Sequence, residues 1–361
     1  MWSRILHFVA NSTVFNITFG VTHQLVISTG MTDFSREFPL NYLTNDVLTE
    51  NSWFTDLLRR WQPAGNEIKI CLGDTGDVPV QNCAKKKSEM GHLRAAFRGG
   101  YMNFYCGGQS ISNVRFSRSG LRAMIHEKYV YGSERTGKKY AKLTSEGIRE
   151  PYTGQLVPYS DQHLEQWIWN AKDKIGTEKR FVDLVVAHNP NVIDVEMGLP
   201  AFSTVREERV APRIDIVALE PYDGRWRVVL WEEKLVGDGR LRCRGSALPK
   251  VVGQLKHYSD WLSDPERAKR VTSAYRNNCR LLVGLHAITG CALPELGPGI
   301  RAVAASDAPP LIVDPNPRLL IIYDKTDRSF EENGHADKLR GAGVPLRIVK
   351  KLNDLALCGL R

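Results

Sequence analysis

The chain has 361 residues, a length that corresponds to two or three domains. Apolar residues make up 42% of it and charged residues 25%, a globular composition that excludes a largely disordered chain. We find no stretch of about 18 uncharged apolar residues, the length of a membrane span, and no apolar core of a secretory signal near residue 1. We therefore expect a cytoplasmic protein. The net charge of +9 favours a polyanionic partner without identifying one.

The positive charge is concentrated in one stretch. Residues 85–149 contain 14 Lys and Arg against 4 Asp and Glu, whereas residues 1–84 have a net charge of −3 and residues 150–361 a net charge of +2. Such a stretch is either a solvated basic face or a surface that contacts phosphates. The candidate nucleic-acid contacts within it are Lys85, Lys86, Lys87, Lys138 and Lys139.

Two features of the basic stretch have competing interpretations. Residues 132–139 nearly match a phosphate-binding loop, but Lys139 stands where a hydroxyl residue would ligate Mg²⁺, so we interpret them as a basic hairpin tip. Tyr101, Phe104 and Tyr105 lie between basic residues. They suit either base stacking or core packing, and core packing is the commoner role.

Local patterns divide the chain into two parts. Residues 1–150 predict a mixed, β-leaning domain, with strand-like alternation at 14–19 and 24–28 and a short helix at 53–61. A Pro-, Gly-, Ser- and Tyr-containing segment, residues 151–160, predicts a linker. Residues 161–361 then predict an α/β domain.

The predicted elements of the second part follow in chain order. We expect helices at 161–175 with Asp161 as N-cap, and at 177–188, 250–262 and 335–340. We expect strands at 212–219, 226–235, 280–288, 318–323 and 345–349. Residues 289–317 are rich in Pro, Gly and Ala and predict a long excursion outside the core.

A predicted hairpin brings acidic residues together. Asp223 and Gly224 are a strong two-residue turn signal, and the register that this turn sets places Asp215 opposite Glu232. Strand alternation puts Lys234 on the same face as Glu232 and points Glu233 to the other face.

Two carboxylates this close repel each other unless a cation lies between them. Oxygen ligation by Asp215 and Glu232, with the carbonyl of Glu233 as an extra ligand, suits Mg²⁺ or Mn²⁺. Lys234 would position the attacking water or stabilise negative charge. These are the parts needed for phosphodiester hydrolysis, although a surface hairpin with a cross-strand salt bridge would show the same residues.

The order of these motifs resembles the PD-(D/E)xK nuclease superfamily. The resemblance covers residues 176–290 and consists of Asp215 on one strand, Glu232-x-Lys234 on the next, and Gln254-x-x-x-Tyr258 on a following helix, similar to the RecB-like branch. It implies a restriction-endonuclease-like mixed sheet flanked by helices, a magnesium-dependent deoxyribonuclease, and a role in restriction or anti-phage defence.

The family commonly carries a further carboxylate on the helix before the sheet. The resemblance makes Glu178 the candidate for this position and Glu207 and Glu208 weaker ones. Glu178 in the first turn of a helix also suits pairing with the helix dipole.

Several alternatives stay open. Arg240, Arg242 and Arg244 follow the Glu-x-Lys strand at alternate positions and would line a phosphate backbone or belong to a solvated loop. DNA is the expected partner and RNA the alternative. The alternative is a catalytically silent nucleic-acid-binding or assembly subunit with the same fold, and the intact Asp215, Glu232 and Lys234 argue against it, because an idle site has no reason to keep buried charges. Cutting both strands of a duplex would call for a homodimer or a partner protein.

Overall fold

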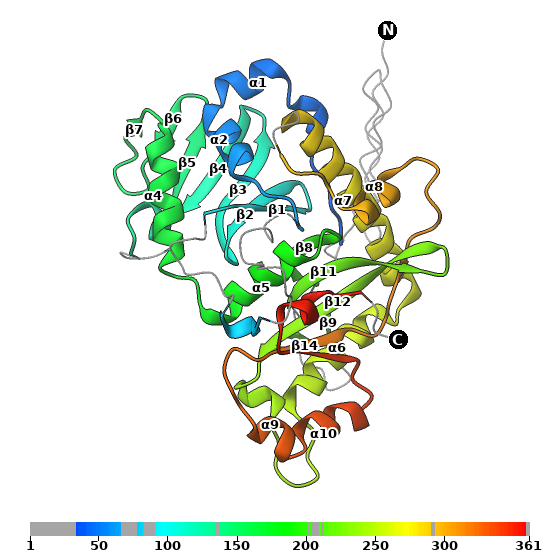
Figure 1. Cartoon of the computed structure of the whole chain (residues 1–361). Helices are drawn as coiled ribbons and strands as arrows, with labels where there is room; N and C mark the ends of the chain where they lie inside the picture. The colour runs from blue at the N-terminus through cyan, green and yellow to red at the C-terminus, as the bar shows by residue number, and fades with distance from the viewer. Residues whose placement is uncertain are drawn as a thin grey trace, which may run out of the picture. The chain divides into compact units, whose positions relative to one another are not determined.

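The structure is a computed structural model of the whole chain (Figure 1). It describes residues 34–65, 78–82, 91–133, 138–200, 202–203, 209–210, 213–289 and 293–358. Residues 34–361 form one compact unit. The described chain is mixed α/β, with one antiparallel and one mixed sheet, both flanked by helices. The strands predicted at 14–19 and 24–28 lie outside the described residues.

The first half of the described chain forms a sheet and its covering helices. The helices are η1 (Leu40–Tyr42), α1 (Asn45–Glu50), α2 (Ser52–Arg60), η3 (Val80–Asn82), α3 (Glu127–Val130) and α4 (Asp161–Lys172). The strands are β1 (Arg94–Arg98), β2 (Tyr101–Cys106), β3 (Gln109–Ser117), β4 (Gly120–His126), β5 (Tyr140–Thr144), β6 (Gly147–Arg149) and β7 (Leu156–Val157). Helix α2 confirms the short helix predicted at 53–61.

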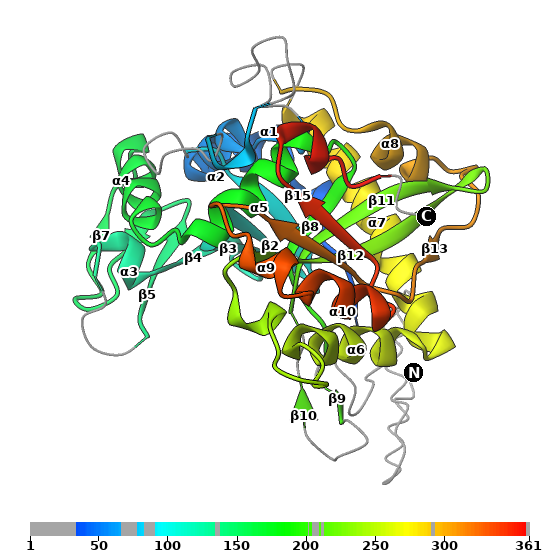
Figure 2. The same ribbon diagram turned by 60° about the horizontal axis from the view of Figure 1, so that its bottom comes forward.

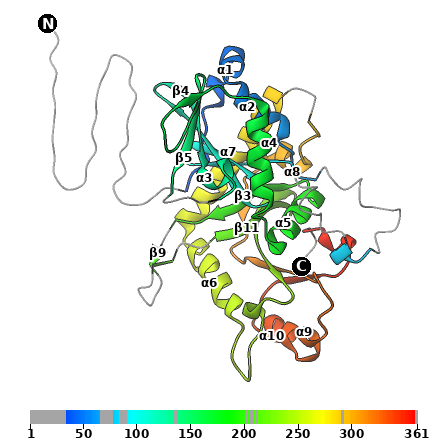
Figure 3. The same ribbon diagram turned by 90° about the vertical axis from the view of Figure 1, so that its left-hand side faces the viewer.

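The first sheet has one apolar and one polar face. Its strands β1 to β7 pair in chain order, each antiparallel to the next. Strand alternation buries Phe97, Phe104 and Val114 against aromatic and aliphatic residues of α2 and α4, which lie along the sheet in Figure 3. The residues between these core positions, such as Asn103 and Arg115, lie on the opposite face, which we call the open face.

The second half forms a mixed sheet. Its helices are α5 (Thr177–His188), η5 (Gly239–Leu241), α6 (Lys250–Leu262), α7 (Pro265–Thr289), α8 (Pro298–Ala304), α9 (Ser329–Glu332), α10 (His335–Gly341) and η7 (Leu352–Leu355). Its strands are β8 (Val192–Gly198), β11 (Arg213–Tyr222), β12 (Arg225–Leu235), β13 (Ile312–Val313), β14 (Arg318–Ile322) and β15 (Leu346–Val349). A separate short pair joins β9 (Phe202–Ser203) to β10 (Arg209–Val210).

The strand order of the mixed sheet is β15-β14-β12-β11-β8, and β13 also pairs with β12. Strands β8, β11 and β12 run antiparallel to one another, whereas β12, β14 and β15 run parallel. Apolar residues of α5 pack on one face of this sheet, and those of α6, α9 and α10 pack on the other. Figures 1 and 2 show α6 and α10 together on their side of the sheet.

Three local predictions for the second half were wrong. Residues 280–288, predicted as a strand, are the last turns of α7, because a short apolar run does not separate a strand from a buried helix and here the helical spacing starts at Val271. Ser160 rather than Asp161 caps α4, through a capping box with His163. Residues 289–317, which were predicted to be a long excursion outside the core, contain α8 and β13.

The predicted boundary at 151–160 does not separate two compact units. This segment carries β7, which pairs with β6 and completes the first sheet. The two sheets are also joined by buried ion pairs, because Arg36 and Arg98 of the first half both hold Asp194 on β8. Strand β8 was missed by the sequence analysis, although Ile193, Val195 and Met197 alternate in its sequence.

Candidate active site

The β11–β12 hairpin has the predicted register. Asp223 and Gly224 both have positive φ, as a tight hairpin turn requires, and Tyr222 pairs with Arg225. The ladder continues in step to Ile216 and Trp231. Asp215 follows directly, and its Oδ2 accepts a 3.0 Å hydrogen bond from the backbone N–H of Glu233. The turn therefore sets which side chains meet at the far end of the hairpin.

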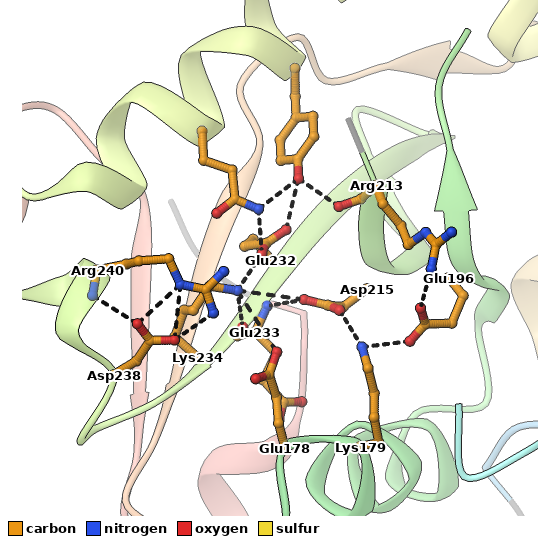
Figure 4. Close-up of polar contacts among 12 residues, drawn as sticks. Glu178, Lys179, Glu196, Arg213, Asp215, Glu232, Glu233, Lys234, Asp238 and Arg240 are labelled. Carbon is orange, nitrogen blue, oxygen red and sulfur yellow. Dashed lines mark hydrogen bonds and ion pairs between the residues drawn. The ribbon is translucent and has the colours of Figure 1, made fainter. Parts of the chain in front are cut away.

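The ammonium of Lys234 lies at the centre of the site (Figure 4). It forms an ion pair with Glu232 and donates a 2.6 Å hydrogen bond to the carbonyl of Glu233. Asp215 Oδ2 and Glu178 Oε1 each lie 3.9 Å from the same Nζ. Lys234 is 1% exposed and Glu232 2%. Four residues from three elements thus turn oxygen atoms toward one buried cation.

Helix α6 adds the two polar residues that its sequence motif predicted. Gln254 Nε2 donates a 2.6 Å hydrogen bond to Glu232 Oε1, and Tyr258 Oη lies 3.0 Å from Glu232 Oε2. Tyr258 also lies 2.6 Å from the carbonyl of Arg213 at the start of β11. The one-turn spacing of the pair places both groups on the helix face toward the sheet, where they orient the Glu232 carboxylate.

Helix α5 contributes Glu178 as expected, and Lys179, which sequence reasoning missed. Lys179 Nζ lies 2.7 Å from Asp215 Oδ1 and 2.5 Å from Glu196 Oε1. Glu196, also missed, has a left-handed backbone conformation with φ of 52° on β8, an uncommon and strained state for this residue. Its only sequence signal was an acidic residue within an alternating apolar strand.

The carboxyl group of Glu233 differs from the others of the site. Glu233 is fully buried, and neither of its side-chain oxygens is hydrogen-bonded within the described part of the chain. Burial, and then the negative charge of Asp215, raises its pKa well above the usual range. Burial and Asp215 likewise raise the pKa of Glu232 to about 7, against the opposing effect of Lys234.

Acidic groups outnumber basic ones among the described residues of the site. The carboxylates are Glu178, Glu196, Asp215, Glu232 and Glu233, and the cations paired with them are Lys179, Arg213 and Lys234. The oxygen donors of Asp215, Glu232 and the Glu233 carbonyl are the kind that a hard divalent cation prefers. In this structure the ammonium of Lys234 lies among them, and over the described residues no three His, Cys, Asp or Glu side chains are arranged to hold a metal ion. The donor chemistry fits Mg²⁺ or Mn²⁺, and the carboxylates would bind one by exchanging contacts with Lys234.

The loop after β12 lies beside the site. Arg240 forms an ion pair with Asp238, and the field of Glu178 and Glu232 acts on its guanidinium. Arg242 is held by Asp327 and the carbonyl of Val236, whereas Arg244 is exposed. Two of the three arginines predicted to contact phosphate, Arg240 and Arg242, therefore form ion pairs that hold this loop.

Two of the five predicted basic contacts of the first half lie among the described residues. Lys138 and Lys139 are exposed just before β5, with Lys139 Nζ 4.3 Å from the centre of the Tyr152 ring. Lys85, Lys86 and Lys87, and the weaker candidates Glu207 and Glu208, lie outside the described residues.

The three aromatic residues of β2 divide between the two sheet faces. Phe104 is in the core, edge to face with Phe54. Tyr101 and Tyr105 lie on the open face, where Tyr105 is largely buried and Tyr101 is half-buried. Phe104 and Tyr105 are therefore packed in the core, the commoner of the two roles that the sequence left open, and Tyr101 is the partly exposed one of the three.

Comparison of the chain with protein-family models, with curated proteins and with solved structures found no match. Within the described part of the chain, none of the helices combines the length and the apolar composition needed to cross a membrane. The site's geometry is therefore the basis for the functional argument.

Proposed function

We propose that this protein is a divalent-metal-dependent nuclease that hydrolyses phosphodiester bonds, with DNA as its expected substrate. The observation that carries the proposal is the convergence of Asp215, Glu232 and Lys234 at the end of the β11–β12 hairpin. The hairpin register and strand alternation selected these residues from the sequence, the resemblance matches the same three, and their side chains meet in space.

The surroundings of the three residues support the same proposal. The acid on the preceding helix, Glu178, reaches Lys234, and Gln254 and Tyr258 bind Glu232. The chain order, α5 before β8, β11 and β12, then α6 and α7, then β14 parallel to β12, agrees with the restriction-endonuclease-like sheet that the resemblance implies.

The roles follow from charge and position. Asp215 and Glu232 would bind Mg²⁺ or Mn²⁺, with the carbonyl of Glu233 as a further ligand. The metal would supply an activated water and neutralise charge on the phosphate. Lys234 would hold a phosphate oxygen or the attacking water, Gln254 and Tyr258 would orient Glu232, and Lys179 would hold Asp215 in place.

The test is cleavage of labelled DNA and RNA, single-stranded and duplex, with Mg²⁺ or Mn²⁺ and with EDTA. We expect EDTA to abolish cutting, and Lys234→Ala and Asp215→Asn to reduce it by about 100-fold or more, a typical loss for a group that stabilises transition-state charge. Nucleic-acid binding should remain.

Lys256→Ala is the matched control, because Lys256 is on the solvent side of α6, where it pairs with Asp260. It should cut like wild type. Equal activity of wild type and Lys234→Ala on every substrate would contradict the proposal, and binding without metal-dependent cutting by wild type would indicate a catalytically silent subunit.

A further inference from the structure

A groove of about 860 Å³ lies on the open face of the first sheet. Its floor consists of residues of β2 to β5, and its far wall includes Lys179, Glu196 and Arg213. Lys179 is hydrogen-bonded to Asp215. The groove therefore ends at Lys179, whose ammonium contacts Asp215 of the candidate active site.

The contact between groove and site is close. Lys179 packs its carbon chain against the β2–β3 turn, where a Cβ on Gly108 would lie 2.9 Å from its Cδ. The turn therefore positions a lysine that belongs to both the groove and the carboxylate cluster.

The open face carries cations that have no acidic partner among the described residues. Arg115 and Lys128 line the groove, and Arg122 and Lys142 lie exposed on neighbouring strands of the same face. Within the described chain none of these four forms an ion pair. Unneutralised cations along one face attract a polyanion.

The groove also offers flat and amide-bearing groups. The Arg115 guanidinium lies 5.3 Å from the centre of the Tyr101 ring, and Tyr140 is 42% exposed. Asn113 donates to Asn103, which donates to Tyr105, so these amides are held in a hydrogen-bonded row. Ring and guanidinium planes stack on bases, and amides bind base edges.

We propose that this groove binds a single-stranded segment of the nucleic-acid substrate and leads it to the carboxylates around Lys234. This inference rests on the proposed nuclease function. Cations alone would suit a duplex equally. Ring and guanidinium planes on the sheet surface stack on base faces only when the bases are unpaired, and this decides for a single strand.

The experiment measures binding of fluorescein-labelled (dT)₁₂ to the full chain by anisotropy in EDTA. The groove variant is Arg115→Ala/Lys128→Ala, and the control Lys256→Ala/Arg340→Ala removes the same charge from the helices of the other sheet. We expect at least tenfold weaker binding for the groove variant only, with a salt slope smaller by about 1.4 for two lost phosphate contacts.

A second variant tests stacking without changing charge. Tyr140→Ala should weaken binding of (dT)₁₂ severalfold, whereas Tyr42→Ala, which removes another exposed tyrosine outside the groove, should not. Far-ultraviolet circular dichroism and melting curves confirm that each variant is folded.

The two proposals fail in different ways. Unchanged (dT)₁₂ binding by the groove variants, or tighter binding of a 12-base-pair duplex than of (dT)₁₂ by wild type, would overturn the groove assignment even if cutting is observed. Groove-dependent binding without metal-dependent cutting would support the groove assignment and contradict the proposed nuclease function. Lys234→Ala, measured alongside, should bind (dT)₁₂ like wild type.

Discussion

Asp194 and Asp215 lie on the adjacent strands β8 and β11, and both are almost completely buried, but their surroundings differ. Asp194 accepts hydrogen bonds from two guanidinium groups, those of Arg36 and Arg98, and from the hydroxyl of Tyr275. Asp215 has lysine partners but shares them with other carboxylates. The two guanidinium groups neutralise Asp194, whereas the lysines around Asp215 are too few to neutralise all the carboxylates that share them.

A second balanced group follows the same pattern as Asp194. Arg318 donates to both oxygens of the buried Glu220, and Arg227 adds a further contact. Both arginines also pair with Asp314, so two guanidinium groups balance two carboxylates. A buried carboxylate with paired guanidinium groups holds strands together at little net cost. A buried surplus of carboxylates destabilises the fold, and such a surplus is typical of sites that bind a cation or a substrate. Charge balance therefore separates structural from functional acids in this protein.

The largest expected effect is on the free energy of unfolding, and it distinguishes Asp194 from Asp215. Asp194→Asn leaves two buried guanidinium groups without their counter-charge, and we expect it to lower the free energy of unfolding by about 3–5 kcal/mol. Asp215→Asn should lower it by less than half as much, because the neutral amide relieves the repulsion with Glu232 while it loses the ion pair with Lys179. Urea unfolding of the wild type and the two variants in EDTA measures both values.

For cutting activity we expect the opposite ranking, with the larger loss in Asp215→Asn. Asp215→Asn should lose metal-dependent cutting at temperatures where it is fully folded, whereas Asp194→Asn should keep it. Equal unfolding losses for the two variants would show that Asp215 is structural in the same sense as Asp194.

Glu233→Gln is expected to stabilise the protein at pH 8 in EDTA by about 1–3 kcal/mol, since it removes a buried carboxyl without a hydrogen-bond partner among the described residues, which the folded state must either protonate or hold as an unpaired charge. The sign of its pH dependence follows from the raised pKa. The folded state binds a proton that the unfolded state has released, so wild-type stability falls as pH rises from the unfolded value, about 4.3, toward the folded one.

The difference between Glu233→Gln and wild type should therefore shrink at pH 5. Melting curves of both proteins between pH 5 and pH 8 measure this dependence. A constant difference across that range would mean that the Glu233 carboxyl keeps an ordinary pKa.

The smallest expected effect concerns the β2–β3 turn. Gly108→Ala and Gly100→Ala both place alanine at a positive φ, near 75°, and each should cost about 1–2 kcal/mol of stability. Of these two positions, only 108 brings the new Cβ against another described residue, Lys179. We expect Gly108→Ala alone to reduce cutting, by severalfold, and equal activity of the two variants would show that the position of Lys179 is not critical.

The site could be predicted where the chain's local pattern set the geometry. The Asp223–Gly224 turn determines the pairing register, and the register brings Asp215 and Glu232 to the same end of the hairpin, directly after the Ile216–Trp231 pair. The one-turn spacing of Gln254 and Tyr258 directs both from α6 to Glu232. Short-range geometry of this kind needs no knowledge of the rest of the fold.

The roles of other residues depend on contacts between distant segments. Lys179 and Glu196 become part of the site because α5 and β8 pack beside the hairpin, and nothing in their neighbours along the chain indicates this. The apolar run at 280–288 has no intrinsic preference strong enough to distinguish strand from helix, and the preceding turns of α7 decided it.

The sequence by itself determined the hairpin, the helices on either side of it and the residues that meet at its end, because turns and periodicity act over a few residues. Only the tertiary structure decided that both sheets belong to one compact unit and that the groove on the open face ends at Lys179, which contacts Asp215. It also decided that Asp194 is balanced by Arg36 and Arg98, from 158 and 96 positions away. Charge balance in a buried site is a property of packed neighbours, and a linear pattern does not contain it.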